Sequence, residues 1–130
     1  MDTITRFGRT IEQYYWVLSE YNMRDVADFS NYYANMKSCI TICNSRGNLT
    51  DAFHLMRQAA FSLLQVASAI KLNLNARKKN LSVEFSQPRQ FFFLSGNQDL
   101  SIYQFSRQLS IQSVFDRLQR VICEMNNVVP

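Results

Sequence analysis

The stretch of residues 50–75, TDAFHLMRQAAFSLLQVASAIKLNLN, decides the fold of this chain. Its apolar residues recur every three or four positions, the spacing that aligns side chains on one face of an α-helix. One stripe consists of Phe53, Met56, Ala60, Leu63, Ala67, Ile70 and Leu74, and a second stripe of Leu55, Ala59, Val66 and Ala69. Only a narrow face is polar, with Arg57, Gln58, Gln65, Ser68 and Lys71. We expect this helix at the centre of the domain, with alanines that allow neighbouring helices to approach closely.

Three other segments carry the same helical spacing, and we expect helices over residues 3–23, 25–44 and 110–126. Their stripes are, in order, Ile4, Phe7, Ile11, Tyr14, Leu18 and Tyr21; Val26, Phe29, Tyr33, Met36, Ile40 and Cys43; and Ile111, Val114, Leu118, Val121 and Met125. The polar residues that lie off the first stripe are Arg6, Arg9, Glu12, Gln13 and Glu20.

The first two stripes are out of phase, which places a break near residues 22–24. No Gly or Pro forces this break, so a single kinked helix is the alternative. Polar side chains are the expected N-caps of the later helices, because they accept hydrogen bonds from unpaired backbone N–H groups. These caps are Asp25 for the second helix, Thr50 or Asp51 for the third, and Ser110 for the last, with a start upstream near Asp99 as the alternative for the last helix.

The period changes between the last two helices. Leu81, Val83 and Phe85 alternate with polar residues, the pattern of a β-strand, and residues 91–94 read Phe-Phe-Phe-Leu. We therefore predict a short β-hairpin over residues 81–94, while residues 100–105 fit either a third strand or a helical turn. The expected fold class is mainly α: one domain over residues 1–130, a four-helix bundle-like arrangement with a short β-hairpin between helices three and four.

The overall composition fits a protein kept inside the cell. The chain has a net charge of +4, three cysteines, and 47% hydrophobic residues without a run long enough to span a membrane. Its first residues lack the apolar core of a secretory signal. We expect an intracellular protein, cytoplasmic or nuclear and not secreted, with free thiols.

The residues that could carry catalysis or bind metal are scarce. Cys39 and Cys43 are four positions apart on a predicted helix, but a zinc site would also need His54 and Cys123. We interpret Cys43 and Cys123 as small core residues flanked by Cys39. His54, the only histidine, is expected in solvent or at a helix end. We therefore predict no catalytic residues, no metal, no cofactor and no enzymatic activity.

Basic residues form the most suggestive group. They are Lys71, Arg77, Lys78, Lys79, Arg89, Arg117 and Arg120, with Arg6 and Arg9 on one face of the first helix. Cations beside the aromatic run that contains Phe91 and Phe92 match the chemistry of a nucleic-acid site, where charge neutralises phosphates and rings stack on bases. The alternative is a solvated basic loop next to a buried aromatic strand.

Aromatic residues are also abundant, with 10 Phe, 6 Tyr and 1 Trp. Tyr15 and Trp16 follow Tyr14, and Tyr32 precedes Tyr33, so these neighbouring rings cannot all face one interior. We therefore expect a partner interface that includes Tyr15, Trp16 and Tyr32 together with Phe91 and Phe92. The leading hypothesis is a helical module that self-associates and binds RNA or DNA, in the manner of a small viral-type accessory or nucleoprotein-like factor. The alternative is an adaptor that binds a host or partner protein through exposed aromatic residues.

Overall fold

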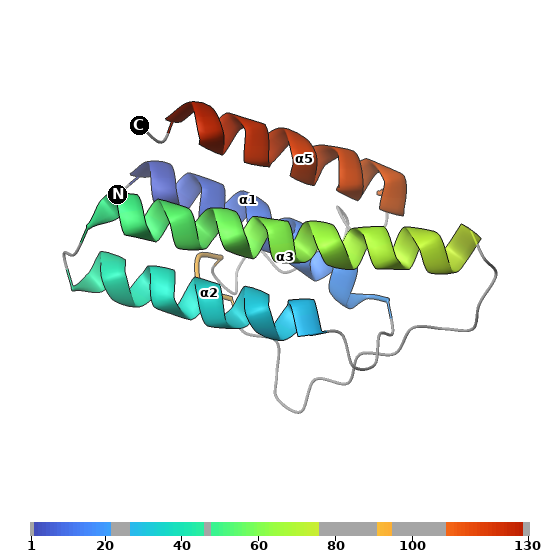
Figure 1. The fold of residues 1–130 in the computed structure, drawn as a ribbon, viewed down its shortest axis with the longest axis horizontal. Coiled ribbons are helices and arrows are strands. Elements are labelled where there is room, and N and C mark those ends of the chain that lie inside the picture. The colour runs from blue at the N-terminus through green and yellow to red at the C-terminus, as the bar shows by residue number, and fades with distance from the viewer. Residues whose placement is uncertain (1, 22–26, 46–47, 76–90, 95–108, 129–130) are drawn as a thin grey trace.

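The computed structural model describes residues 2–21, 27–45, 48–75, 91–94 and 109–128. These residues form four helices: α1 (Asp2–Ser19), α2 (Ala27–Asn44), α3 (Leu49–Asn75) and α5 (Ile111–Val128). The helices alternate in direction, and the start of α1 and the end of α5 lie at the same end of the bundle (Figure 1). The prediction of four helices packed against each other is therefore confirmed.

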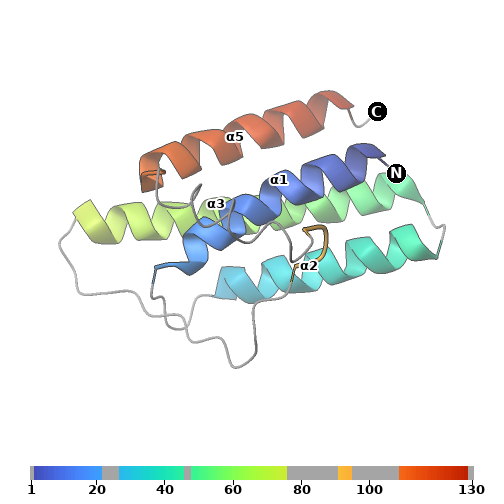
Figure 2. The same ribbon diagram turned by 180° about the vertical axis from the view of Figure 1, so that it is seen from behind.

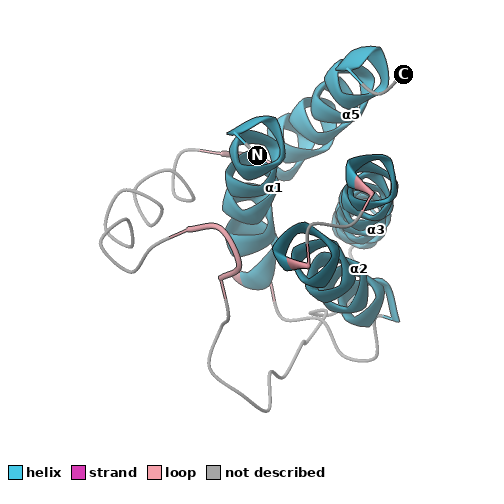
Figure 3. Ribbon diagram, turned by 90° about the vertical axis from the view of Figure 1, so that its left-hand side faces the viewer, coloured by secondary structure: helices cyan, strands magenta, loops and turns pink. Residues whose placement is uncertain are grey.

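Helix α3 occupies the central position predicted from its composition. It packs against α1, α2 and α5, and α1 also packs against α5 (Figure 3). Four of the fully buried residues of α3 are alanines, at positions 52, 59, 60 and 67. Because an alanine projects only a methyl group, these positions let the neighbouring helices come close to the α3 backbone.

Helix α1 ends earlier than the predicted residue 23. The backbone N–H groups of Glu20 and Tyr21 donate to the carbonyls of Val17 and Leu18, three residues back, at 3.1 Å each. This tighter hydrogen-bond pattern closes the last turn and ends the helix after Ser19. The predicted break between the first two helices is confirmed, because α1 and α2 are separate helices. Residues 22–26, which include Val26 and the predicted cap Asp25, lie outside the described residues.

The buried face of α2 is rotated from the predicted stripe. Its buried residues are Phe29, Tyr32, Met36 and Cys39, whereas Tyr33, Ile40 and Cys43 are only half-buried. The rotation follows from α1, because the Tyr15 ring stacks on Tyr32 at 4.9 Å between centroids and so draws Tyr32 into the core. The face of α2 with Tyr32 and the face with Tyr33 are both apolar, so the sequence pattern does not predict which of them is buried.

The caps of the last two described helices differ in how well they were predicted. Ser110 caps α5, because its Oγ accepts the backbone N–H of Ser113 at 3.2 Å, as predicted. The prediction of Thr50 or Asp51 for α3 was wrong. Asn48 is the cap, with its Oδ1 accepting the N–H of Thr50 at 2.9 Å.

The described part of the predicted β-hairpin is not a strand. Residues 91–94 follow a bend, and residues 81–90 and 100–105 lie outside the described ranges. The backbone N–H groups of Phe92, Phe93 and Leu94 all donate to the same carboxyl group, that of Glu12. Successive N–H groups of a strand point to opposite sides, so three of them cannot converge on one acceptor in a hairpin. The aromatic run packs on helices α1 and α2 as a bend.

We find no helix among the described residues that combines the length and the apolar character needed to cross a membrane.

Candidate functional site

The best-defined polar site of the described chain lies where residues 91–94 meet helix α1. Gly8, Glu12 and Trp16 follow one another at intervals of four residues and therefore form a line along one side of α1. We call these three residues the docking stripe and residues 91–94 the FFFL segment. Figure 2 shows the FFFL segment, in orange, beside α1 and α2.

Glu12 holds the main chain of the FFFL segment. Its side chain is fully buried. Oε1 accepts the N–H of Phe92, and Oε2 accepts the N–H groups of Phe93 and Leu94 at 2.8 Å each. Three N–H groups that converge on an acidic group form a concave anion-binding arrangement of the backbone. In this protein the anion is one of its own side chains, so both oxygens of Glu12 are committed to the segment.

Burial dominates the acid–base properties of Glu12. It raises the pKa of the carboxyl group from 4.5 to about 7, although the hydrogen bonds from Phe93, Phe92 and Leu94 oppose this shift by favouring the charged form. Carboxyl groups with raised pKa values are common in active sites. Glu12 has no exposed surface, and both of its oxygens already accept N–H groups of the FFFL segment, so its geometry is that of an anchor.

The aromatic rings of the FFFL segment are held one by one. Phe91 stacks on the Trp16 indole at 5.3 Å between centroids, and Phe92 meets Tyr33 of α2 edge to face at 5.9 Å. Phe93 lies over Gly8, where any Cβ atom would overlap its ring. In successive turns of α1, the docking stripe therefore provides the Trp16 ring for stacking, the Glu12 carboxyl group as a hydrogen-bond acceptor, and space above Gly8 for the Phe93 ring.

One further contact fixes the direction of the segment. Arg9, next to Gly8, donates from Nε to the carbonyl of Phe93 at 3.3 Å. Leu94 is buried at the end of the segment, while the three phenylalanines are half-buried. The main chain is thus recognised through both N–H and C=O groups, and the rings through stacking and shape.

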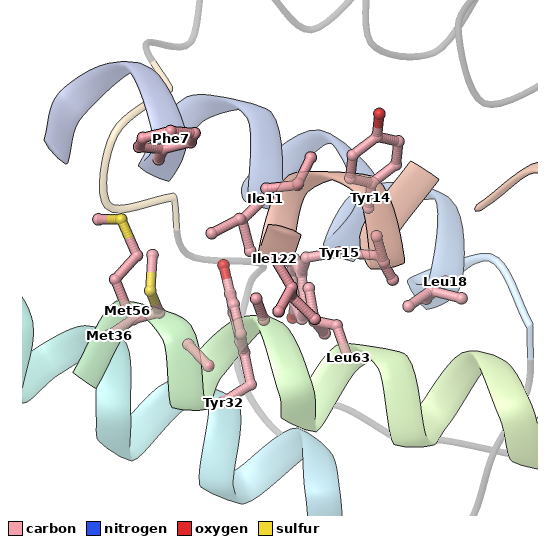
Figure 4. Close-up of a cluster of buried hydrophobic side chains, with 14 of the residues drawn as sticks. Phe7, Ile11, Tyr14, Tyr15, Leu18, Tyr32, Met36, Met56, Leu63 and Ile122 are labelled. Carbon is pink, nitrogen blue, oxygen red and sulfur yellow. The ribbon is translucent and has the colours of Figure 1, made fainter. Parts of the chain in front are cut away.

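Three tyrosines pack against one another, and one of them, Tyr32, is close enough to Glu12 to be affected by its charge. Tyr15 of α1 bonds through its hydroxyl to the hydroxyl of Tyr33 and stacks on Tyr32. The Tyr32 ring rises from α2 toward α1 (Figure 4). Its hydroxyl is buried and has no hydrogen-bond partner among the described residues. Burial, with the nearby charge of Glu12 as a smaller contribution, raises the pKa of Tyr32 well above 10, so this hydroxyl stays neutral.

The residues predicted to form a partner interface divide into two groups. Tyr15 and Tyr32 are completely buried within one copy of the chain, so an exposed aromatic surface does not include them. Trp16, Phe91 and Phe92 are half-buried, and the structure brings them together at the docking stripe. The abundance of aromatic residues therefore belongs partly to the core and partly to this internal contact.

The residues predicted to bind nucleic acid do not all lie together. Lys71 of α3 places its Nζ 5.0 Å from the centre of the Phe115 ring. Arg117 and Arg120 are exposed on α5, and Arg117 lies roughly 200° around the helix from Phe115, at 100° per residue. The side of α5 that Lys71 contacts is therefore not the side on which Arg117 lies. Arg77, Lys78, Lys79 and Arg89 lie outside the described residues.

A second pair of arginines lies on a neighbouring helix. Arg6 and Arg9 are exposed on α1, which packs directly against α5. The Arg6 guanidinium also lies 5.2 Å from the centre of the Phe7 ring. Two exposed arginine pairs, on α1 and on α5, are thus carried by adjoining helices.

The cysteines occupy other positions than predicted. Cys39 is buried, Cys43 is half-buried and Cys123 is exposed, so Cys39 is the core residue of the three. Cys123 follows the buried Ile122, and one step around α5 carries it from the core to the surface. His54 is exposed and contacts Arg57. No group of three metal-ligating side chains occurs among the described residues.

In the sequence, Glu12 is one of the polar residues outside the apolar stripe of α1, and that position does not predict its contact with the FFFL segment. The usable signal was the interval of four residues that separates Gly8, Glu12 and Trp16 beside the apolar stripe. Comparisons of the chain with protein-family models, with curated proteins and with solved structures found no match.

Proposed function

We propose that this chain is a non-enzymatic helical module that self-associates and binds an anionic partner, with RNA or DNA as that partner. The observation that carries the proposal is that two helices packed against each other carry exposed arginines, Arg6 on α1 and Arg117 and Arg120 on α5. Guanidinium groups form bidentate hydrogen bonds with phosphate, and two adjoining helices can present them to successive phosphates. The net charge of +4 adds a long-range attraction for a polyanion.

The lysine- and arginine-rich stretch predicted from the sequence belongs to the same proposal. Arg77, Lys78, Lys79 and Arg89 follow α3 in the chain and add four positive charges. Lys71 is a weaker candidate, because it is half-buried whereas Arg6, Arg117 and Arg120 are exposed.

Binding to short single-stranded RNA, single-stranded DNA and duplex DNA across a salt series tests the proposal. We expect affinity to fall steeply with salt and Arg120→Glu to weaken binding to every sequence. The salt slope should become smaller by about 1 for each phosphate that the variant no longer neutralises. Lys37→Glu is the matched control, since Lys37 is exposed on α2 and the change in charge is identical.

The pair Lys78→Glu with Lys79→Glu tests the stretch after α3 in the same assay. Binding that does not respond to salt, or no binding to any of the three nucleic acids, would contradict the proposal. Equal losses for Arg120→Glu and Lys37→Glu would show a response to net charge without a defined site.

A protein-binding adaptor is the second candidate function, and one observation favours it. Phe61 and Leu72 on α3 are 47% and 67% exposed, although large apolar side chains gain by burial. They are eleven residues apart, close to three helical turns, and therefore share a face. Phe61→Ser with Leu72→Ser should abolish binding to a protein partner while leaving binding to nucleic acid unchanged.

A further inference from the structure

We propose that the docking stripe of one copy accepts the FFFL segment of a second copy, so that the chain self-associates by exchanging this segment. The inference deepens the self-association in the proposed function and does not depend on nucleic-acid binding. It assigns the stripe Gly8, Glu12 and Trp16 as a peptide-binding site, and a short aromatic peptide with consecutive free N–H groups as its ligand.

The first argument is that the FFFL segment is bound in the manner of a peptide ligand. Its main chain meets a dedicated acceptor, Glu12, and a dedicated donor, Arg9. Its first and third rings each have a separate site, on Trp16 and over Gly8. Recognition of main-chain groups together with side-chain sites is how proteins bind short peptides in trans. Every copy of the chain carries both the site and its ligand.

The second argument concerns reach. Fifteen residues separate the end of α3 from Phe91 in the sequence, and a chain of that length spans at most ~50 Å. Helix α3 has 27 residues and is therefore about 40 Å long. Residues 95–110, which connect the segment to α5, give a similar reach, so both covalent connections are long enough to let the segment bind a neighbouring copy. An identical contact made between copies is the condition for domain exchange.

The third argument is the choice of residue at position 12. Burying a carboxyl group costs free energy that an apolar residue in contact with the same rings would not cost. What Glu12 adds is selectivity, because it accepts only a segment that presents three N–H groups together. Such selectivity serves recognition of a ligand that can arrive from more than one molecule.

Complementation between two variants tests the proposal. Gly8→Leu fills the space of the Phe93 ring and leaves the segment intact, whereas Phe92→Ser with Phe93→Ser disables the segment and leaves the stripe intact. Each variant alone should be a monomer of 15.2 kDa, and their mixture should form a 1:1 complex of twice that mass in light scattering. The mixture should associate readily, because neither variant has a competing contact within its own chain. Wild type should form dimers at higher concentration.

Trp16 gives a second and independent measurement, since it is the only tryptophan and stacks directly on Phe91. A peptide with the sequence of residues 90–95, Gln-Phe-Phe-Phe-Leu-Ser, should change Trp16 fluorescence in the Phe92→Ser/Phe93→Ser variant and not in Gly8→Leu. Circular dichroism checks that both variants are folded, and the peptide titration remains informative if one of them is not.

A mixture that stays monomeric, together with a peptide that leaves Trp16 fluorescence unchanged, would overturn the proposal and assign the contact to a single chain. Dimers of Gly8→Leu alone would overturn it as well, because its stripe is blocked. Measurements at different salt concentrations distinguish a failure of segment exchange from a failure of nucleic-acid binding. Exchange of the FFFL segment should persist at salt concentrations that abolish nucleic-acid binding, because its contacts pair no two charged groups.

Discussion

At the scale of single residues, Glu12 shows how a polar side chain can belong to the core. A position off the apolar stripe of an amphipathic helix is normally solvated, and that rule is right for Arg6 and Arg9. It fails for Glu12 because a segment about 80 residues away covers that face and supplies three N–H donors. The apolar spacing of the helix carries no information about a contact so distant in sequence.

The first prediction concerns the pH dependence of stability. Because burial raises the pKa of Glu12 from 4.5 to about 7, the folded chain keeps a proton there that the unfolded chain releases. The contribution of Glu12 to the free energy of unfolding should therefore fall as pH rises from about 4.5 to about 7, by up to about 3 kcal/mol. Urea unfolding of wild type and Glu12→Gln over this range measures it, since glutamine cannot titrate.

The control for this experiment is Glu124→Gln, which removes an exposed carboxyl group of α5. It should leave the pH dependence of wild type intact, whereas Glu12→Gln should flatten it. A constant difference in unfolding free energy between wild type and Glu12→Gln across the range would rule out the raised pKa.

The second prediction concerns the hydroxyl groups of Tyr32 and Tyr33. Tyr32→Phe removes a buried hydroxyl that has no partner among the described residues, so stability should be unchanged or rise by up to about 1 kcal/mol. Tyr33→Phe removes the hydroxyl that bonds to Tyr15 and should lower stability by about 1 kcal/mol. Thermal unfolding compares the two variants directly, and an equal loss in both would mean that the Tyr32 hydroxyl is hydrogen-bonded in solution.

At the scale of helices, the apolar spacing located the elements well and their detailed faces less well. Helices α3 and α5 begin within one residue of prediction. The buried face of α2 was misjudged because Tyr32 and Tyr33 are equally apolar candidates, and only the position of Tyr15 on α1 decides between them. Over residues 91–94 the predicted strand is absent for a similar reason: three phenylalanines favour a strand locally, but Glu12 draws their backbone into a bend.

The third prediction concerns the start of α3. Asn48→Ala should lower the free energy of unfolding by about 1 kcal/mol, because it leaves the N–H of Thr50 without its acceptor. Thr50→Ala, at the position expected from the sequence to be the cap, should cost clearly less. Urea unfolding of both variants tests the assignment, and a larger loss for Thr50→Ala would refute it.

At the scale of the whole molecule, the antiparallel four-helix arrangement could be predicted from the chain itself. Four apolar stripes of limited length, joined by short or polar segments, favour a bundle, and the nearly all-apolar α3 takes the centre. The candidate site could not be predicted in this way. Its parts come from residues 8–16, from Tyr33 and from the FFFL segment, and it exists only after the helices have packed.

The long separation between Glu12 and its donors also has a consequence for the order of folding. Helices α2 and α3 follow each other with only residues 45–48 between them, so their contact closes a short loop and can form early. The contact of Glu12 with residues 92–94 encloses about 80 residues and becomes favourable only when the bundle is in place. The FFFL segment should therefore bind in the last step of folding, so weakening its contacts should speed unfolding while leaving the folding rate nearly unchanged.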